Sequence, residues 1–192
     1  MTDQAMTGTK ADLIEHLTRE HREVEQLWSQ LQAAHHRGDT LQGDLGRQIV
    51  TSLSQHDAVE LQILYPAIRD HVPGGDQLAD EALEEHAEVR NQLSEVDGED
   101  PSDGAVFERF STILTNVEAH VAEEESTLFP QLRTHCSAEQ LANLGEKLET
   151  AEKAAPTHPH PHTPDSKLGA TVAGAAAGVA DRLRDAARGD HS

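Results

Sequence analysis

The chain has 192 residues, and 15 Lys and Arg against 35 Asp and Glu give it a net charge of −20 at pH 7. This balance argues strongly against a nucleic-acid-binding module, because phosphate contacts need clustered Lys and Arg. The single cysteine, Cys136, excludes intramolecular disulfides and Cys-rich zinc sites. Aromatic residues are only 3% of the chain, so a core must come from Leu, Ile, Val and Ala, which favours helices.

The sequence also indicates a soluble, cytoplasmic protein with no membrane partner. Its first residues, MTDQAMTGTK, lack the basic and apolar regions of a secretory signal. No stretch reaches the roughly 18 apolar residues of a membrane span. Histidine is frequent, with 13 residues against 15 Lys and Arg, and this composition directs attention to metal binding.

Apolar residues at three- and four-residue steps predict four long helices, at about residues 10–36, 45–66, 77–96 and 105–135. The segments RGDTLQGD, PGGD and DGEDPSDG supply the turns between them. Ser137, with Gln140 three residues later, is the expected N-cap of a short fifth helix that reaches about Ala154. Long helices with short connections predict an all-α fold, an antiparallel up-down four-helix bundle.

The residues after 155 differ in character. The segment PTHPHPHTPD alternates proline with histidine and therefore predicts a flexible, extended linker around His158, His160 and His162. The last stretch is rich in Ala and Gly and predicts at most a weakly amphipathic helix. Its apolar side chains are mostly too small to anchor a core. We therefore expect one domain at residues 10–155, followed by a His/Pro-rich linker and an Ala/Gly-rich tail of uncertain order at residues 156–192.

Comparison of the chain with itself reveals a duplication. One segment repeats at an offset of 65 (86 − 21) and a second at an offset of 64 (120 − 56). The matched pairs are Glu20 and Glu85, His21 and His86, His56 and His120, Glu60 and Glu124, Leu64 and Leu128, Tyr65 and Phe129, and Pro66 and Pro130. Two helical hairpins therefore share one plan, with a histidine on the first helix and HxxxE on the second.

The duplicated polar residues fall on the apolar faces of their helices. Each residue of a helix turns about 100°, so residues four apart share a face, and HxxxE places both side chains in the middle of an apolar stripe. The histidines of the other two helices lie in their stripes as well. Six side chains then point from four helices toward one interior: His21, His56, Glu60, His86, His120 and Glu124.

Burial of an unpaired carboxylate costs several kcal/mol, a large part of the roughly 5–15 kcal/mol that stabilises a typical domain. A His–Glu hydrogen-bond network, a surface location or cation coordination would each remove that cost. An imidazole and carboxylate set without thiolate suits iron, manganese or zinc. Two bridging carboxylates with terminal histidines are typical of di-iron sites in helix bundles, so we favour a site for two cations.

The order H, HxxxE, H, HxxxE on four successive helices resembles that of the hemerythrin family, in particular its HHE cation-binding domains. The similarity covers about residues 10–150 and implies a non-haem di-iron centre with an oxo or hydroxo bridge. Manganese or zinc would be substitutes. The resemblance assigns His21 and His56 to one iron, His86 and His120 to the other, and Glu60 and Glu124 to both.

The pattern departs from that of the oxygen-carrying hemerythrins. Those proteins have a second histidine one turn after the ligand of the third helix, where this chain has Arg90, and HxxxxD on the last helix, where it has HxxxE. The iron at His86 and His120 would have one protein ligand fewer. An open position favours reaction with small oxidants over reversible oxygen carriage. We expect H2O2 first, in a catalase-like disproportionation, and also O2 or NO.

A non-enzymatic O2 or NO sensor, or an iron store, is the alternative, with residues 156–192 as the element that binds a protein partner. Three residues are candidates for a role beside the ligands: Glu25, Tyr65 and Arg90. Glu25 is the pseudo-equivalent of Arg90 and either acts as a base, pairs with Arg90 or is a solvated charge, which we favour slightly. Tyr65 could form a hydrogen bond near the site or donate an electron, but we favour a packing role, because its duplicate is Phe129.

Some neighbours are expected to have no direct role. His16 lies about 140° around the helix from His21, which predicts a surface position. Glu125, beside a predicted ligand, is expected to be solvated or to act from outside the ligand set. Pro66 and Pro130 each remove a helical hydrogen bond, so the helices are expected to kink or end there.

Overall fold

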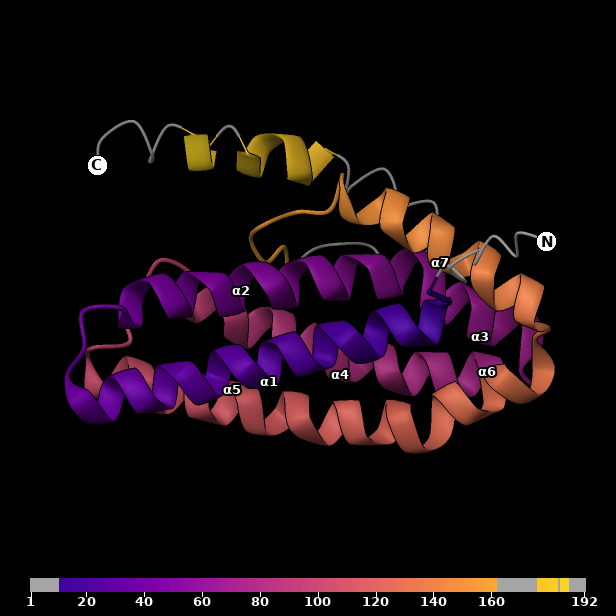
Figure 1. Ribbon diagram of the computed structural model, residues 1–192, viewed down its shortest axis with the longest axis horizontal. Coiled ribbons are helices and arrows are strands. Elements are labelled where there is room, and N and C mark those ends of the chain that lie inside the picture. The colour runs from indigo at the N-terminus through magenta and orange to yellow at the C-terminus, as the bar shows by residue number, and fades with distance from the viewer. Residues whose placement is uncertain (1–10, 162–175, 183, 187–192) are drawn as a thin grey trace, which may run out of the picture.

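The computed structural model describes residues 11–161, 176–182 and 184–186. Within these residues the secondary structure is helical, and four long helices run up and down beside one another (Figure 1). Their bounds are α1 Leu13–Arg37, α2 Gln42–Val59, α4 Gly75–Val96 and α5 Gly104–Glu123. The predicted all-α, antiparallel four-helix bundle is therefore confirmed.

Short π-helical turns interrupt the second and fourth long helices. The segments are η1 Glu60–Leu64, continued by α3 Tyr65–His71, and η2 Glu124–Leu128, continued by α6 Phe129–His135. In each turn the residue before the proline donates its N–H to the glutamate carbonyl five residues back, so the wide turn accommodates the missing donor of Pro66 or Pro130. The helices therefore do not end at the prolines.

Capping residues set the ends of the outer helices. Asp12 and Glu15 form a capping box at the start of α1, and Gly38, with φ of 65°, closes its C-terminus. The short fifth helix, α7 Ala138–Glu152, begins at the predicted cap, where Ser137 and Gln140 form a second capping box. The sequence therefore predicted the start of α7 from local hydrogen-bonding chemistry alone.

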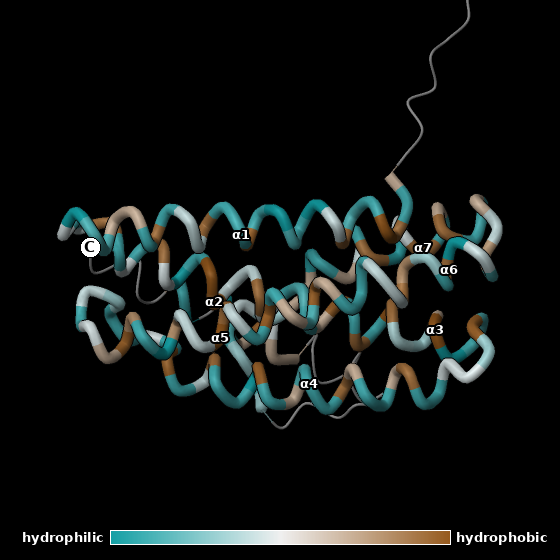
Figure 2. The backbone as a smooth tube through the Cα atoms, turned by 90° about the horizontal axis from the view of Figure 1, so that it is seen from below, coloured by the Kyte–Doolittle hydropathy of each residue, from teal (hydrophilic) through white to brown (hydrophobic). Residues whose placement is uncertain are grey.

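The interior has two apolar clusters with a polar layer between them. One cluster fills the end of the bundle around α3, α6 and α7, and the other fills the opposite half between α1, α2, α4 and α5. Figure 2 shows apolar and polar positions alternating along each helix as the amphipathic pattern requires. On each long helix the duplicated histidine falls between residues of the two clusters. The clusters therefore seal the polar layer from both ends.

The fifth helix corrects one expectation. Helix α7 packs against α1 and α2, and the absence of a side chain at Gly145 lets its backbone approach Ala11, since a Cβ there would lie 2.7 Å from that carbonyl. His16 lies under this helix and is only 4% exposed, with Nε2 3.1 Å from Glu149 Oε1. The prediction of a surface position for His16 was wrong, because the face opposite His21 is covered by α7.

The segment after α7 folds back along the bundle. Residues 155–161 have no helix, as predicted, but His158 is only 8% exposed and is held by carboxylates, which a flexible linker would not show. Residues 176–182 and 184–186 are helical, whereas His162 lies outside the described residues. No helix in the described part of the chain is long and apolar enough to cross a membrane.

Candidate metal centre

Six side chains from all four arms of the bundle meet in the polar layer. They are His21 of α1, His56 near the end of α2, Glu60 at the start of η1, His86 of α4, His120 of α5 and Glu124 at the start of η2. Both glutamates are 0% exposed. The structure thus brings together every residue that the sequence predicted as a metal ligand.

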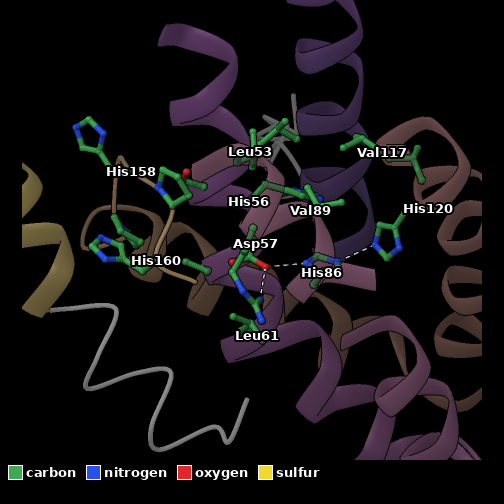
Figure 3. A pocket seen from close by; sticks show the side chains of 17 residues that line it. Leu53, His56, Asp57, Leu61, His86, Val89, Val117, His120, His158 and His160 are labelled. Carbon is green, nitrogen blue, oxygen red and sulfur yellow. Dashed lines mark hydrogen bonds and ion pairs between the residues drawn. The ribbon is translucent and has the colours of Figure 1, made fainter. Parts of the chain in front are cut away.

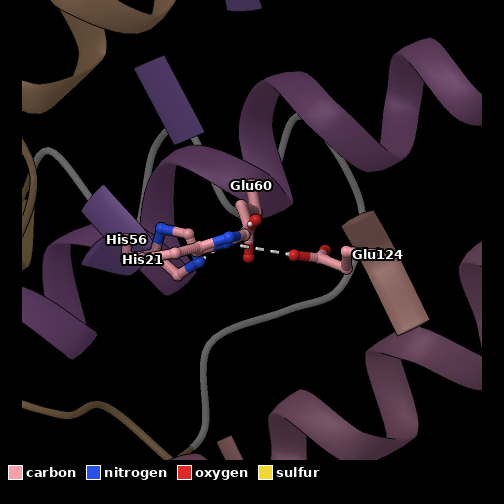
Figure 4. Close-up of side chains that lie close together, drawn as sticks. All are labelled: His21, His56, Glu60 and Glu124. Atoms are coloured by element: carbon pink, nitrogen blue, oxygen red, sulfur yellow. Dashed lines mark ion pairs between the residues drawn. The ribbon is translucent and has the colours of Figure 1, made fainter. Parts of the chain in front are cut away.

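The six residues form two overlapping groups that share both glutamates. One group is His21, His56, Glu60 and Glu124, drawn in Figure 4, and the other is Glu60, His86, His120 and Glu124. Within each group, one ligand atom of every residue lies within 4.8 Å of the others. Each carboxylate therefore faces both histidine pairs, as two neighbouring cations with shared carboxylates require.

Several buried polar atoms in this layer have no hydrogen-bond partner. They are His21 Nε2, His56 Nε2, Glu60 Oε1 and Oε2, and Glu124 Oε2. A buried polar atom without a partner costs about 1–3 kcal/mol, and more when it is charged. Cations placed among these atoms would satisfy all of them at once, and nitrogen with oxygen donors is the set that iron, manganese and zinc accept. The residues therefore fit a metal centre.

Each histidine has its other ring nitrogen held by a carboxylate. The Nδ1 contacts are His21 to Glu125 at 2.9 Å, His56 to Glu20 at 2.8 Å, His86 to Asp57 at 2.8 Å and His120 to Glu85 at 2.7 Å. An ionised carboxylate only accepts hydrogen bonds, so each Nδ1 donates to its carboxylate and each Nε2 is the atom left to bind a cation. Histidines that bind metals have this support.

Sequence reasoning missed most of these supporting carboxylates. Glu20 and Glu85 occupy equivalent positions of the duplicated segments, directly before a histidine ligand, and this repetition was a usable signal. Asp57 had no such signal, because the duplication places Val121 opposite it. For Glu125, 26% of whose side chain is exposed, the expected position outside the ligand set agrees with its bond to His21.

Tyr65 contributes more than packing. Its ring is buried as expected, but its hydroxyl lies 2.6 Å from His86 Nε2 and donates a hydrogen bond to Glu124 Oε1 at 3.1 Å. The duplicate residue, Phe129, stacks on His21 with ring centroids 5.8 Å apart. The expectation of a packing role is corrected, because duplication predicts the position of a ring and not what a hydroxyl will bond.

Arg90 and Glu25 have separate partners. Arg90 is 3% exposed and donates to Asp57 at 2.8 Å, the carboxylate that also holds His86. Glu25 is exposed and pairs with Arg22 of its own helix. The interpretation of Glu25 as a solvated charge therefore agrees with the structure, and Asp57 takes the place of the partner considered for Arg90.

The protonation of the layer is strongly perturbed without a cation. Burial and the nearby charge of Glu124 raise the pKa of Glu60 well above its usual value. Burial lowers the pKa of His56 to about 3. Burial also disfavours the charged form of His120, but hydrogen bonding and attraction to Glu124 outweigh it and raise the His120 pKa to about 9. Cation binding would therefore displace protons from this layer.

All six residues lie within the part of the chain that matches a known family. The family model of the hemerythrin HHE cation-binding domain matches residues 12–132. An uncharacterized hemerythrin-like protein of Schizosaccharomyces pombe is 28% identical over 139 residues, which are 72% of this chain and 68% of that protein. A Nostoc protein named DNA nickase is 30% identical over 133 residues, 69% of this chain but 37% of that protein. No solved structure matches.

Proposed function

This chain belongs to the hemerythrin family of HHE cation-binding domains, and we propose that it holds two iron ions that react with small oxidants, hydrogen peroxide first. His21 and His56 would bind one ion, His86 and His120 the other, and Glu60 and Glu124 both. Manganese and zinc accept the same donors and are the alternative occupants.

The observation that carries this proposal is the sharing of Glu60 and Glu124 by both groups of donors. A single cation would leave one pair of histidines facing the buried carboxylates without a ligand role, although the four histidine side chains are only 1–10% exposed. Two cations use all six residues. The bundle thus supports a two-ion centre better than a single-ion centre.

The expected chemistry follows from the ligand count on one side of the centre. Arg90 stands where oxygen carriers place another histidine, and its Nη1 donates a hydrogen bond to Asp57. The His86 and His120 side therefore keeps a position for a small molecule. Bound iron ions would supply the electron transfer that converts two molecules of hydrogen peroxide into two of water and one of oxygen.

Tyr65 is the group of this chain best placed to handle a proton on that side. Its pKa is raised well above the usual value by burial and by the charges of Glu124 and Glu60, so the hydroxyl keeps its proton. It donates a hydrogen bond to Glu124 and lies 2.6 Å from His86 Nε2. We assign it the role of orienting the shared carboxylate and of donating a hydrogen bond within the site.

The test is metal analysis of freshly purified protein, with its ultraviolet–visible spectrum and an oxygen-electrode assay of peroxide decomposition. We expect about two irons per chain, charge-transfer bands of a bridged iron pair, and oxygen evolution on addition of peroxide. Glu60→Gln and Glu124→Gln should lose iron and activity, whereas His135→Ala, at an exposed histidine, should keep both.

Two results would redirect the proposal. An iron-loaded protein that neither decomposes peroxide nor changes its spectrum with peroxide, O2 or NO contradicts it. A spectral change without turnover would instead favour a sensor of O2 or NO, whose partner would be sought through residues 156–192.

A further inference from the structure

A small cavity lies directly against the candidate centre. Its volume is about 40 Å³, and it lies between α2, α4 and α5 (Figure 3). Three of the four predicted histidine ligands, His56, His86 and His120, form part of its lining. The remaining walls of the bundle are mostly apolar and include Leu53, Leu61, Val89 and Val117. A molecule in this cavity would touch the centre on its His86 and His120 side.

The segment after α7 completes the lining. Pro156, His158, Pro159 and His160 all line the cavity, although they lie about a hundred residues along the chain from its α2 wall. We call residues 156–160 the strap. Pro156 and His158 are buried, so the strap is packed against the bundle and does not trail in solvent.

One carboxylate of the helical residues 176–182 holds the strap by its backbone. Asp181 is 0% exposed, and its Oδ2 accepts the N–H of Thr157 at 3.0 Å and that of His158 at 3.1 Å. The same oxygen lies 3.0 Å from His160 Nε2. Three contacts at one buried carboxylate fix the course of the strap across the cavity.

The side chain of His158 ties the strap to both sides. Its Nδ1 lies 2.9 Å from the carboxylate of Asp97, just after α4, and its Nε2 lies 2.9 Å from Asp185 Oδ1. Carboxylates on both ring nitrogens favour the imidazolium, and such charge-assisted hydrogen bonds are stronger than neutral ones. His158 therefore links the end of α4, the strap and the C-terminal helical residues.

We propose that the strap sets the size of the molecules that reach the metal centre through this cavity. A water needs roughly 10–15 Å³ of such volume, so the cavity holds about three waters and accepts hydrogen peroxide, O2 or NO. An alkyl hydroperoxide such as tert-butyl hydroperoxide exceeds that volume, and the apolar walls disfavour charged oxidants. This inference rests on the proposed function for its substrates, but the barrier itself belongs to the metal-free chain.

The barrier can be measured without any metal chemistry. Ser54 lines the cavity, is 4% exposed and its hydroxyl has no hydrogen-bond partner, so Ser54→Cys places a thiol behind the strap. The native thiol, Cys136 at the end of α6, does not line the cavity and serves as the internal reference. Reaction rates are measured with a small methanethiosulfonate and with a bulky maleimide, in the full chain.

Asp181→Asn, added to Ser54→Cys, should release the strap, and so should termination of the chain after residue 161. We expect each change to raise the rate of the maleimide at position 54 at least tenfold while the rate at Cys136 stays constant. Asp80→Asn, at an exposed carboxylate paired with Arg69, is the matched control and should change neither rate. Circular dichroism verifies that every variant is folded, and Asp185→Asn replaces any variant that is not.

The inference would be overturned if the maleimide reacted at position 54 equally fast in Ser54→Cys and in the chains that also carry Asp181→Asn or end after residue 161. The iron-loaded proteins provide the second measurement, the ratio of rates with tert-butyl hydroperoxide and hydrogen peroxide, which release of the strap should raise. Failure of the proposed function removes both peroxide reactions but leaves the thiol result intact. Failure of the strap inference leaves hydrogen peroxide turnover intact and equalises the thiol rates, so the two failures are distinguishable.

Discussion

The two halves of the candidate centre descend from one duplicated hairpin, yet they differ in what surrounds the donors. Both halves keep the same support for the histidine of HxxxE, since Glu20 contacts His56 as Glu85 contacts His120. The histidine of the other helix is supported differently in each half. Glu125, bonded to the exposed Arg22, holds His21, whereas Asp57, bonded to the buried Arg90, holds His86.

The aromatic residues repeat this contrast. Phe129 lays an apolar ring against His21, whereas Tyr65 turns a hydroxyl toward His86 and Glu124. The cavity borders both histidines of the Tyr65 half and, in the other half, His56. The difference teaches that duplication preserved the six predicted donors, while the aromatic ring beside them diverged into an apolar contact in one half and a hydroxyl in the other.

The largest expected effect comes from residues that serve both halves. Glu124→Gln removes one oxygen donor from each group, so we expect iron content to fall from about two ions per chain to well below one. Metal analysis after gel filtration measures this loss. Glu81→Gln, at an exposed glutamate of α4, is the control, and retention of two irons by Glu124→Gln would contradict the shared-carboxylate arrangement.

A smaller effect should be confined to one half. Asp57→Asn removes the carboxylate that holds His86 and leaves Arg90 with a weaker partner, so iron affinity should fall about 10–100-fold at one of the two ions. Glu125→Gln is the matched change in the other half, but its carboxylate is more exposed and its loss should cost less. Stepwise iron titration followed by absorbance measures the affinity for each of the two ions. Equal losses of affinity at both ions would contradict the difference between the two halves.

Exchange of the aromatic residues tests which half reacts. Tyr65→Phe keeps the ring but removes the hydroxyl, so we expect kcat for peroxide to fall about tenfold, with iron content unchanged. Phe129→Tyr instead inserts a hydroxyl into an apolar contact and should cost about 1–3 kcal/mol of stability. Oxygen evolution and thermal unfolding measure the two effects, and wild-type kcat in Tyr65→Phe would exclude the role assigned to the hydroxyl.

The smallest expected effect concerns pH and the strap. Burial disfavours the charged form of His158, but Asp185 and Asp97 outweigh it and raise the pKa of His158 above 6.5. A raised pKa means that the stabilisation is fully present below pH 6.5 and is lost as pH rises through the folded-state value. Hydrogen exchange at the amides of residues 157 and 158, corrected for intrinsic rates, should therefore become faster as pH rises through the folded-state pKa of His158. The substitution His158→Gln should abolish this dependence on pH.

The sequence predicted the bundle and its six polar residues because both depend on local periodicity and on repetition. Four apolar stripes determine four helices, and two copies of HxxxE determine which polar residues those stripes contain. Ser137 was predicted as a cap for the same reason, since its partner Gln140 lies three residues away.

Features that depend on distant segments could not be predicted in this way. The position of His16 required knowledge that α7 covers its face of α1. The strap depends on Asp97 and Asp181, which lie 61 and 23 residues from His158, and no local pattern connects them. The partner of Asp57 likewise lies on another helix. Long-range pairing of charges is therefore where sequence reasoning fell short.

The π-helical turn at Glu60 has a consequence for the angular phase of the residues that follow it. In a regular α-helix a residue five positions on lies about 140° around the axis, which would direct Tyr65 away from the face that Glu60 occupies. The wider turn spreads the same five residues over little more than one revolution and brings both side chains back to one face. Removal of one residue from this turn would restore a regular helix in which Tyr65 follows Glu60 by four positions, about 40° around the axis, so the phenol would stay on the face of the layer.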